Sequence, residues 1–544
     1  MSACEPTSNI KSRAVAVRLR VFRNTTVIFR DPNLVEMVEW VTTPAFTERV
    51  NTLMRDFHIP GLSVAVLDGD TVHTRCFGHA SIESDTSVDA NTIFDIASCS
   101  KALTGVAMGI LVDNHPKLSK LSWKTPVVEL IGDGFVMHRV EDNDEVTVEN
   151  LLSHTSGFSG RHDMSVLGIN AAHPDNVRSV TRNLRHLPST ARPGEKYQYS
   201  NIMYAVATHI IETLSGHTFS SFLHENIFKP LSMDTTFLQP SEVYAADLAS
   251  RFATPFYHEN DTYHQATHQE VPEFQGAGSI QTTPSDYIKF IAAMLHHNKS
   301  PITQTIYDGV TRPRVMRNSK HSLDDFNPTS SAVAYALGWD IKYRSSQQIV
   351  SHDGVITGYG SSMFFLPDRR FGAVFIGNSS AAFGVCQILQ SEIIDEFLST
   401  PKEQRFDLSR GQLERQVAQE ERKMKKLTRN RERRKQARGT LEVPAEKYCG
   451  TFFNAAYRGV TIEMQDGDLY IDAADRSEPF DMVLEHVKDN REFRGYITAD
   501  DGRGEDGIAV EVRLDEKDDV VAVGFNWDPE LGSKYFFWHE RTAS

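Results

Sequence analysis

Residues 94–112, FDIASCSKALTGVAMGILV, are the stretch that decides the fold of this chain. The part after Lys101 is uncharged, rich in helix formers and apolar on nearly every side, which is typical of a buried helix. Ser98 lies where this helix is expected to begin, and Lys101 follows three residues later. Because residues three apart share one face of a helix, we expect the hydroxyl and the amine to lie side by side.

This Ser–Lys pair suggests nucleophilic chemistry. A lysine at the start of a buried helix is energetically costly unless the site uses it. An amine next to a serine can accept the hydroxyl proton, and burial or a neighbouring cation lowers the pKa of the amine and makes this easier. Free N–H groups at the start of the helix also suit an oxyanion. The pattern S-x-x-K is weak on its own, and a serine that only caps the helix is the alternative.

Length and composition indicate the class of protein. At 544 residues the chain exceeds one ordinary domain, so two or three are expected. A hydrophobic content of 40% with a mean hydropathy of −0.36 is typical of a globular protein with a large core. The net charge of −15 argues against general affinity for nucleic acid or an anionic membrane. No run approaches the roughly 18–20 apolar residues of a membrane span.

The five cysteines are far apart and odd in number, which argues against a disulfide framework and favours a reducing compartment. No Cys/His cluster points to a metal, and we expect neither metal nor cofactor. Residues 1–40 are predicted to be a basic tail, which resembles a weak mitochondrial transit segment. A disordered tail or a short strand is the favoured alternative, so we expect a cytoplasmic protein, with a mitochondrial one as the alternative.

Strand patterns occur on both sides of the opening stretch. A helix is predicted over 44–56, followed by a hairpin of strands 62–67 and 71–77. Much later, strands are predicted over 347–354, 361–366 and 371–378, with a closing helix over 385–398. The predicted fold class is therefore α+β, with an antiparallel sheet whose strands come from both ends of the domain and a large helical insertion between them.

A second group of candidate side chains precedes an apolar helix predicted over 202–214. Tyr199 and Asn201 are two residues apart, so in an extended backbone they project to the same side and would form another wall of a site. A tyrosine half-buried at a domain seam is the alternative. His154, at the end of a predicted helix, is interpreted as structural. The glycine-rich segment 276–278 lacks a phosphate-binding pattern and is interpreted as a tight turn.

The chain changes character after residue 400. Residues 401–442 are highly charged and poor in large apolar residues, and we interpret them as a charged helical linker. Basic runs such as those in this segment can bind nucleic acid, but a solvated linker is favoured because the protein is acidic and no aromatic residues accompany these basic runs. Residues 443–544 contain short alternating strands separated by turns, which predicts a small all-β barrel.

With these segments in place, the chain resembles the serine β-lactamase and penicillin-binding-protein superfamily, in the class C-like branch that also holds family VIII esterases, D-aminopeptidases and D-Ala-D-Ala carboxypeptidases. The resemblance covers about residues 41–400 and implies a β-lactamase/transpeptidase-like domain. Residues 443–544 resemble the lipocalin-like barrel that often follows it. The motifs that carry the resemblance are Ser98-Cys99-Ser100-Lys101, Tyr199-Ser200-Asn201 and His352-Asp353-Gly354, supported by Ile59-Pro60-Gly61, the segment LLSHTSG at 151–157 and Gly276-Ala277-Gly278.

The resemblance implies a role for each motif residue. Ser98 would attack an acyl carbonyl and become acylated, while Lys101 and Tyr199 share the proton transfers, and which of them is the base stays open. Asn201 would orient Lys101 and the substrate. The backbone N–H groups of Ser98 and Val355 would form the oxyanion hole. The residues implied in substrate binding are Asn201, His352, Gly354 and Val355.

His352 stands where β-lactamases usually have a lysine. A fixed cation there binds the carboxylate of β-lactams and peptide C-termini, whereas a histidine of ordinary pKa is mostly neutral at pH 7. Asp353 adds a negative charge, so efficient β-lactam hydrolysis is not expected. We expect a serine hydrolase acting on a small-molecule or peptide-like ester or amide, with no nucleic-acid partner. An acyltransferase using the same residues and a non-catalytic scaffolding protein are the alternatives.

Overall fold

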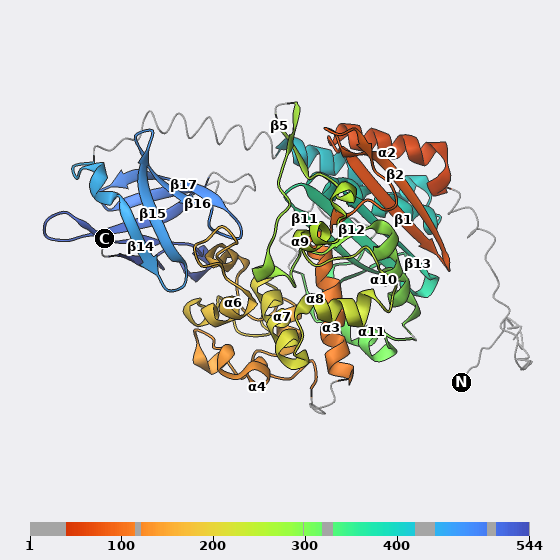
Figure 1. Ribbon diagram of the computed structural model, residues 1–544, viewed down its shortest axis with the longest axis horizontal. Coiled ribbons are helices and arrows are strands. Elements are labelled where there is room, and N and C mark those ends of the chain that lie inside the picture. Colours follow the sequence, from red (N-terminus) through yellow and green to blue (C-terminus); the bar gives the residue numbers. More distant parts are fainter. Residues whose placement is uncertain are drawn as a thin grey trace, which may run out of the picture.

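The computed structural model describes residues 40–114, 121–259, 261–297, 299–317, 330–418, 441–497 and 507–542. The predicted N-terminal tail lies outside these residues except for Trp40, and so does the part of the predicted linker from 419 to 440. Figure 1 shows a sheet covered by helices, a layer of short helices beside it, and a β-barrel next to that layer.

The central sheet has nine strands in the order β3-β2-β1-β13-β12-β11-β10-β9-β8, and all neighbouring pairs are antiparallel. β1 from the start of the domain pairs with β13 from its end, which confirms the predicted α+β class and the joining of strands from both ends. The strands are β1 (Gly61–Asp68), β2 (Thr71–Ser81), β3 (Thr86–Ser87), β8 (Val315–Met316), β9 (Ala334–Tyr335), β10 (Asp340–Arg344), β11 (Gln347–Ile356), β12 (Tyr359–Leu366) and β13 (Phe371–Gly377).

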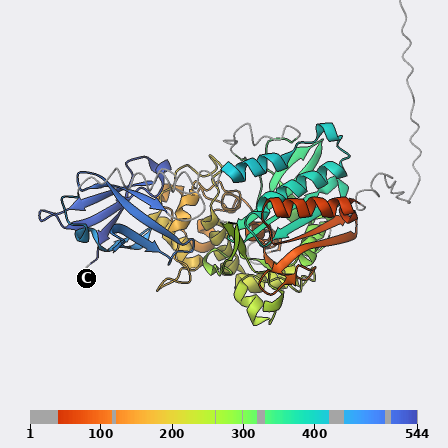
Figure 2. The same ribbon diagram turned by 90° about the horizontal axis from the view of Figure 1, so that it is seen from above.

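The central strands β1, β12 and β13 are buried on both faces of the sheet. Successive side chains of a strand point to opposite faces, so each strand contributes to two cores. Val64 and Val66 of β1 pack in one core with α2 (Pro44–Asp56) and α12 (Ala382–Phe397), which lie on one side of the sheet in Figure 2. Ala65 belongs to the core on the other face, which contains α10 (Pro284–His296) and α3 (Ser100–Asn114). The predicted buried helix after Ser98 is α3, and its apolar residues pack against both the sheet and the helical insertion.

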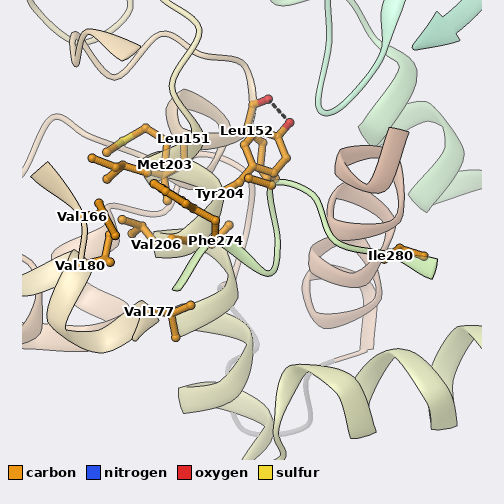
Figure 3. Packing of buried hydrophobic residues seen from close by; sticks show 14 of the residues in the cluster. Leu151, Leu152, Val166, Val177, Val180, Met203, Tyr204, Val206, Phe274 and Ile280 are labelled. Carbon is orange, nitrogen blue, oxygen red and sulfur yellow. Dashed lines mark hydrogen bonds between the residues drawn. The ribbon is translucent and has the colours of Figure 1, made fainter. Parts of the chain in front are cut away.

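The helical insertion is built around α7 (Asn201–Ser215), the helix predicted over 202–214. It ends at Gly216, whose left-handed φ of 73° allows the chain to leave the helix. Figure 3 shows the side chains of α7 packed against those of α5 (Val148–Leu152) and α6 (Val177–Asn183), and the Tyr204 hydroxyl donates to the carbonyl of Leu152 at 2.7 Å. This packing fixes the first residue of α7, which lies at the site described below.

Shorter elements complete the domain. They are α4 (Val127–Ile131), α8 (Phe219–Leu223), α9 (Pro240–Ala245), α11 (Gln304–Thr311), β4 (Phe94–Asp95), β5 (Phe256–Glu259), β6 (Thr262–Gln265) and β7 (Gln281–Thr282). β4 pairs with β7, so the strand immediately before Ser98 is held to the chain immediately after Gly276-Ala277-Gly278. Two regions far apart in the sequence are thereby brought together.

The C-terminal domain is a closed barrel of eight antiparallel strands, with neighbours in sequence order and β14 paired to β21. This confirms the predicted small all-β barrel, while its lipocalin-like character stays a prediction. Its strands are β14 (Gly450–Asn454), β15 (Arg458–Gln465), β16 (Asp468–Ala473), β17 (Phe480–Lys488), β18 (Glu492–Ile497), β19 (Ile508–Leu514), β20 (Val520–Phe525) and β21 (Phe537–Arg541).

Candidate active site

Ser98 lies in a short 3-10 turn, η2 (Ala97–Cys99), that continues directly into α3. Ala97 has a left-handed φ of 46°, and its N–H donates to Asp95 Oδ1 at 2.6 Å. A non-glycine residue in this region is strained, and such strain is found most often at functional sites. The turn places the Ser98 hydroxyl at the start of the buried helix.

The three residues expected to carry the chemistry meet at this point. Ser98 Oγ lies 2.7 Å from the Tyr199 hydroxyl oxygen and 3.1 Å from Lys101 Nζ. Tyr199 precedes α7, and Lys101 is in the first turn of α3, so two packed helices bring these groups together. The Lys101 ammonium position also lies 4.7 Å from the centre of the Tyr199 ring.

The other partners of Lys101 define which form of the amine fits. Nζ lies 2.8 Å from Asn201 Oδ1 and 2.7 Å from the carbonyl oxygen of Ala277, and both of these oxygens can only accept hydrogen bonds. A neutral amine has two N–H donors and one lone pair, so these two acceptors take both donors. The lone pair is then directed at the third neighbour, Ser98 Oγ. The geometry therefore suits an amine that accepts the serine proton.

Asn201 is held in the required orientation by a buried carboxylate. Its Nδ2 donates to Asp163 Oδ2 at 3.0 Å, which leaves Oδ1 facing Lys101. Asp163 belongs to the 3-10 helix η5 (Gly160–Ser165) and is 3% exposed. Without this carboxylate the amide could flip and present an N–H group to Lys101.

Burial separates the two candidate bases. Desolvation lowers the pKa of Lys101 to about 7, although the Asp163 carboxylate opposes the shift. Burial raises the pKa of the Tyr199 phenol above its usual value, against the effect of its hydrogen bond to Ser98. At neutral pH a large fraction of Lys101 is uncharged, whereas Tyr199 keeps its proton. Lys101 is therefore the better candidate for the base.

His352 lies on β11, is 5% exposed, and uses both ring nitrogens within the protein. Nδ1 lies 2.7 Å from the carbonyl oxygen of Asp353, so it carries the hydrogen, and Nε2 accepts from the Tyr335 hydroxyl at 3.0 Å. Burial and then the charge of Lys101 lower the pKa of His352 to about 3. The ring is therefore uncharged at neutral pH, more firmly than a histidine of ordinary pKa would be.

Gly354 and Val355 lie where β11 passes the start of α3. A Cβ on Gly354 would stand 2.3 Å from the carbonyl oxygen of Ile96 and 3.1 Å from the backbone nitrogen of Ser98, so only glycine allows this approach. Val355 follows and is 51% exposed. The sequence predicts a strand that ends at Gly354, which is wrong, because Val355 and Ile356 continue the pairing with β12.

Three contributors were absent from the predicted site: Asp163, Tyr335 and the carbonyl of Ala277. The glycine before Ala277 was a signal of close approach, since a Cβ on Gly276 would stand 2.1 Å from Thr208 Oγ1. Asp163 and Tyr335 lie in no recognisable motif. His154 is buried behind Tyr199, with ring centres 4.3 Å apart, and its Nδ1 accepts from the backbone N–H of Ser200 at 3.1 Å.

Within the described ranges, no group of three or more His, Cys, Asp or Glu side chains is placed to hold a metal ion. Among the helices of the described part of the chain, none combines the length and apolar character needed to cross a membrane.

Sequence comparison identifies the family to which this fold and this polar cluster belong. Residues 46–385 match the β-lactamase family, and residues 434–540 match a domain of unknown function, DUF3471. The chain belongs to the β-lactamase family, because the match covers more than half of it and a 30% identical relative aligns over 90% of both chains.

Two relatives that align over most of this chain carry hydrolase names. The unguisins hydrolase ungD' of Aspergillus campestris is 30% identical over 505 residues, which is 90% of each chain. The unguisins hydrolase ungD of Aspergillus violaceofuscus is 28% identical over 530 residues, which is 92% of this chain and 90% of that one. Both alignments extend through the catalytic domain and the barrel, and they support a hydrolase.

Solved structures share the fold. An octameric penicillin-binding-protein homologue from Pyrococcus abyssi covers 91% of this chain and 99% of its own, with a TM-score of 0.57 and 17% identity. A D-amino acid amidase from Ochrobactrum anthropi covers 66% of this chain and 100% of its own, with a TM-score of 0.51 and 21% identity. At these identities the likeness concerns the fold alone.

Proposed function

We propose that this protein is a serine hydrolase that cleaves an amide or an ester through an acyl-enzyme on Ser98. The observation that carries the proposal is the arrangement around Lys101, whose Nζ lies within hydrogen-bond distance of Ser98 Oγ, Asn201 Oδ1 and the Ala277 carbonyl oxygen. When the amine is neutral, the latter two acceptors take its two N–H groups and leave its lone pair for Ser98. A serine that merely caps a helix needs no such partner.

In the proposed acylation step, Ser98 Oγ attacks the substrate carbonyl carbon and its proton passes to Lys101 Nζ. The resulting oxyanion accepts hydrogen bonds from the backbone N–H groups of Ser98 and Val355. The intermediate collapses, the bond to the leaving group breaks, and the leaving amine or alkoxide takes a proton through the Tyr199 hydroxyl, which is replenished from Lys101.

Deacylation runs the same proton path in reverse order. A water molecule attacks the acyl carbon while its proton passes through Tyr199 to Lys101, and the bond between the acyl carbon and Ser98 Oγ breaks. Ser98 regains its proton from Lys101, and the product acid leaves. Tyr199 serves as a relay in both steps because its own pKa is raised, so it transfers a proton without resting as an anion.

Uncharged, peptide-like substrates suit this site best. His352 is neutral and bonded to Tyr335, so it supplies no cation for a substrate carboxylate. The guanidinium of Arg317 lies 2.5 Å from Asp340 Oδ2, and this ion pair offsets the positive charge of Arg317. The names of the two fungal relatives make unguisins the first natural compounds to test.

The test is hydrolysis of a matched set of neutral and carboxylate-bearing esters and anilides, with products identified by mass spectrometry. We expect the neutral members to be cleaved faster, and we expect Ser98→Ala to lose turnover by a factor of about 10³–10⁶, since the nucleophile is gone. Products transferred to an added amine or alcohol in preference to water would indicate an acyltransferase. A Ser98→Ala variant that retains a tenth of the activity or more would overturn the proposal.

A further inference from the structure

The barrel contacts the catalytic domain at segments that hold or adjoin active-site residues. Gln198, the neighbour of Tyr199 in the chain, donates to Glu530 at 3.2 Å, and Lys196 pairs with the same carboxylate at 3.0 Å. These contacts lie at the rim of the interface and are partly exposed. Two further contacts are deeper, and each leads to a group that bonds Lys101.

The first deep contact joins the barrel to η5, the helix that carries Asp163. His162 is fully buried, and its Nε2 faces the carbonyl oxygen of Pro188 at 2.9 Å, so this nitrogen carries the hydrogen. Nδ1 must then accept from the Tyr457 hydroxyl of the barrel, also at 2.9 Å. The residue after His162 is Asp163, whose carboxylate orients the amide of Asn201.

The loop between β16 and β17 continues this contact along the catalytic domain. The N–H of Gly168 donates to the carbonyl of Asp475 at 2.9 Å, and the N–H of Ser477 donates to the carbonyl of Val166 at 3.0 Å. Between them, Leu167 and Arg476 form an antiparallel bridge. The barrel thus adds a short strand-like partner to the chain that leaves η5.

The second deep contact reaches the segment that carries Ala277. The Ser477 hydroxyl donates to the carboxylate of Glu273, which is fully buried. Burial raises the pKa of Glu273 to about 7, and the hydrogen bond from Ser477 opposes this shift. The next residue, Phe274, accepts from the N–H of Ala277 at 2.7 Å, and the Ala277 carbonyl in turn accepts from Lys101.

Both contacted segments are anchored in the same core. Val166 and Phe274 pack with the side chains of α7 in the cluster of Figure 3. Asn201 is the first residue of α7, so a shift of either segment would move the acceptors of Lys101 relative to each other.

We propose that the C-terminal barrel positions Lys101 for catalysis, because Tyr457 and Ser477 hold the two segments that carry Asp163 and Ala277. The proposal rests on the proposed function, in which Lys101 is the base. Tyr457 and Ser477 are positioning residues, since each acts on Lys101 only through the groups between them.

The electrostatics of Lys101 provide a second link to the barrel. Glu478, half-buried in the same loop, is a carboxylate whose negative charge, like that of Asp163, raises the pKa of Lys101 against the larger effect of burial. Other ionisable groups near Lys101 are Tyr199, Tyr204, His352 and His154. Burial keeps these four rings and the Cys99 thiol uncharged at neutral pH. Removing the charge of Glu478 should therefore lower the pKa of Lys101.

The experiment compares Ser477→Ala, Ser477→Thr, Tyr457→Phe and Glu478→Gln in the full chain. Steady-state hydrolysis of one neutral activated ester gives kcat and KM as functions of pH, and a fluorophosphonate probe reports on Ser98. Glu492→Gln, which removes the same charge from an exposed position on β18, is the control for Glu478→Gln. Thermal unfolding is recorded for every variant.

We expect Ser477→Ala and Tyr457→Phe to lower kcat by about tenfold with little change in KM, because small displacements of a catalytic group slow the chemical step. Ser477→Thr keeps the hydroxyl and should restore kcat. Glu478→Gln should move the acidic limb of the pH profile to lower pH, and Glu492→Gln should leave it in place. If these residues had a merely structural role, their substitution would change the unfolding temperature without moving the acidic limb of the pH profile.

Unchanged kcat in both hydroxyl variants, or an acidic limb that does not move in Glu478→Gln, would contradict the positioning role while the wild type remains active and labelled at Ser98. A wild-type chain that is neither active nor labelled would overturn the proposed function, and the positioning role with it. If Tyr457→Phe fails to fold, the comparison of Ser477→Ala with Ser477→Thr and the result for Glu478→Gln still decide the question.

Discussion

At the scale of single residues, the hydrogen-bond donors and acceptors define the network formed by Ser98, Lys101 and Tyr199. Asn201 and Ala277 leave a neutral Lys101 with a lone pair for Ser98, and the Tyr199 hydroxyl lies 2.7 Å from the same serine oxygen. The sequence leaves the choice of base open between the lysine and the tyrosine. The buried environment favours the lysine, since desolvation opposes the charged form of both groups. The neutral form of Lys101 can accept a proton, whereas the neutral phenol of Tyr199 is not a base.

If Tyr199 and Lys101 form one proton-transfer unit, their removal should not be additive. We expect Tyr199→Phe to lower kcat by about 10²–10⁴-fold, as the loss of a proton-transfer group does. Lys101→Ala should cost at least as much, and the double variant little more than the worse single variant. Steady-state kinetics of the three variants on one activated ester measures this. Losses that simply multiply, or a fully active Tyr199→Phe, would place Tyr199 outside the mechanism.

The lowered pKa of Lys101 predicts how activity depends on pH. Only the neutral amine accepts the serine proton, so kcat/KM should rise with pH up to about 7 and fall as Lys101 is protonated below it. His352, with a pKa of about 3, stays neutral across this range and does not produce the limb.

Glu273 also has a pKa of about 7 and serves as the control for that profile. The acidic limb should persist in Glu273→Gln, which retains hydrogen-bonding capacity towards Ser477. The measurement is kcat/KM on a neutral ester over about pH 5–9, a range that brackets both groups. A flat wild-type profile, or a limb that disappears in Glu273→Gln, would remove Lys101 from the role of base.

At the scale of elements, the sequence predicts the hairpin β1–β2, the helices α3 and α7 and the late strands, because hydrophobic periodicity and turn residues mark them. The motif residues Ser98, Lys101, Tyr199 and Asn201 could be found because they lie beside these elements. The role of Asp163 could not be predicted, since it lies on a 3-10 helix without any motif and acts only once α7 has packed against it. The role of a main-chain group such as the Ala277 carbonyl could not be predicted, because every residue type carries the same carbonyl.

The close approach of β11 to α3 allows a prediction about one element. Ala at Gly354 would clash with Ile96 and press on the backbone of Ser98. We expect Gly354→Ala to lower the free energy of unfolding by about 1–3 kcal/mol and kcat by about 10²-fold, since the oxyanion donors are displaced.

Gly459 in the barrel is the matched control for this substitution, because a Cβ there would meet nothing within 4 Å. Chemical unfolding and ester hydrolysis of Gly354→Ala and Gly459→Ala, measured side by side, make the comparison. If the two variants were equally stable and equally active, β11 would have no part in shaping the site.

At the scale of the whole molecule, the sequence predicts two hydrophobic cores separated by a charged segment. In the described residues, the buried side chains of the barrel instead form one cluster with those of the helical insertion and of one face of the sheet. The sequence does not predict how the sheet domain and the barrel are placed, because contacts between domains, such as the hydrogen bond from Tyr457 to His162, leave no periodic pattern. The placement matters for function, since the barrel contacts the chain on both sides of Asp163 and near Ala277. Relatives that align through both domains are consistent with a single functional unit.

The most direct test of the account is covalent labelling of Ser98. The full chain is incubated with a fluorophosphonate probe at neutral pH, digested, and mapped by mass spectrometry. We expect one modified peptide, carrying the probe on Ser98, no label in Ser98→Ala, and slow labelling in Lys101→Ala because the base is absent. No label on the wild-type chain, or a label on another residue that persists in Ser98→Ala, would contradict the central claim.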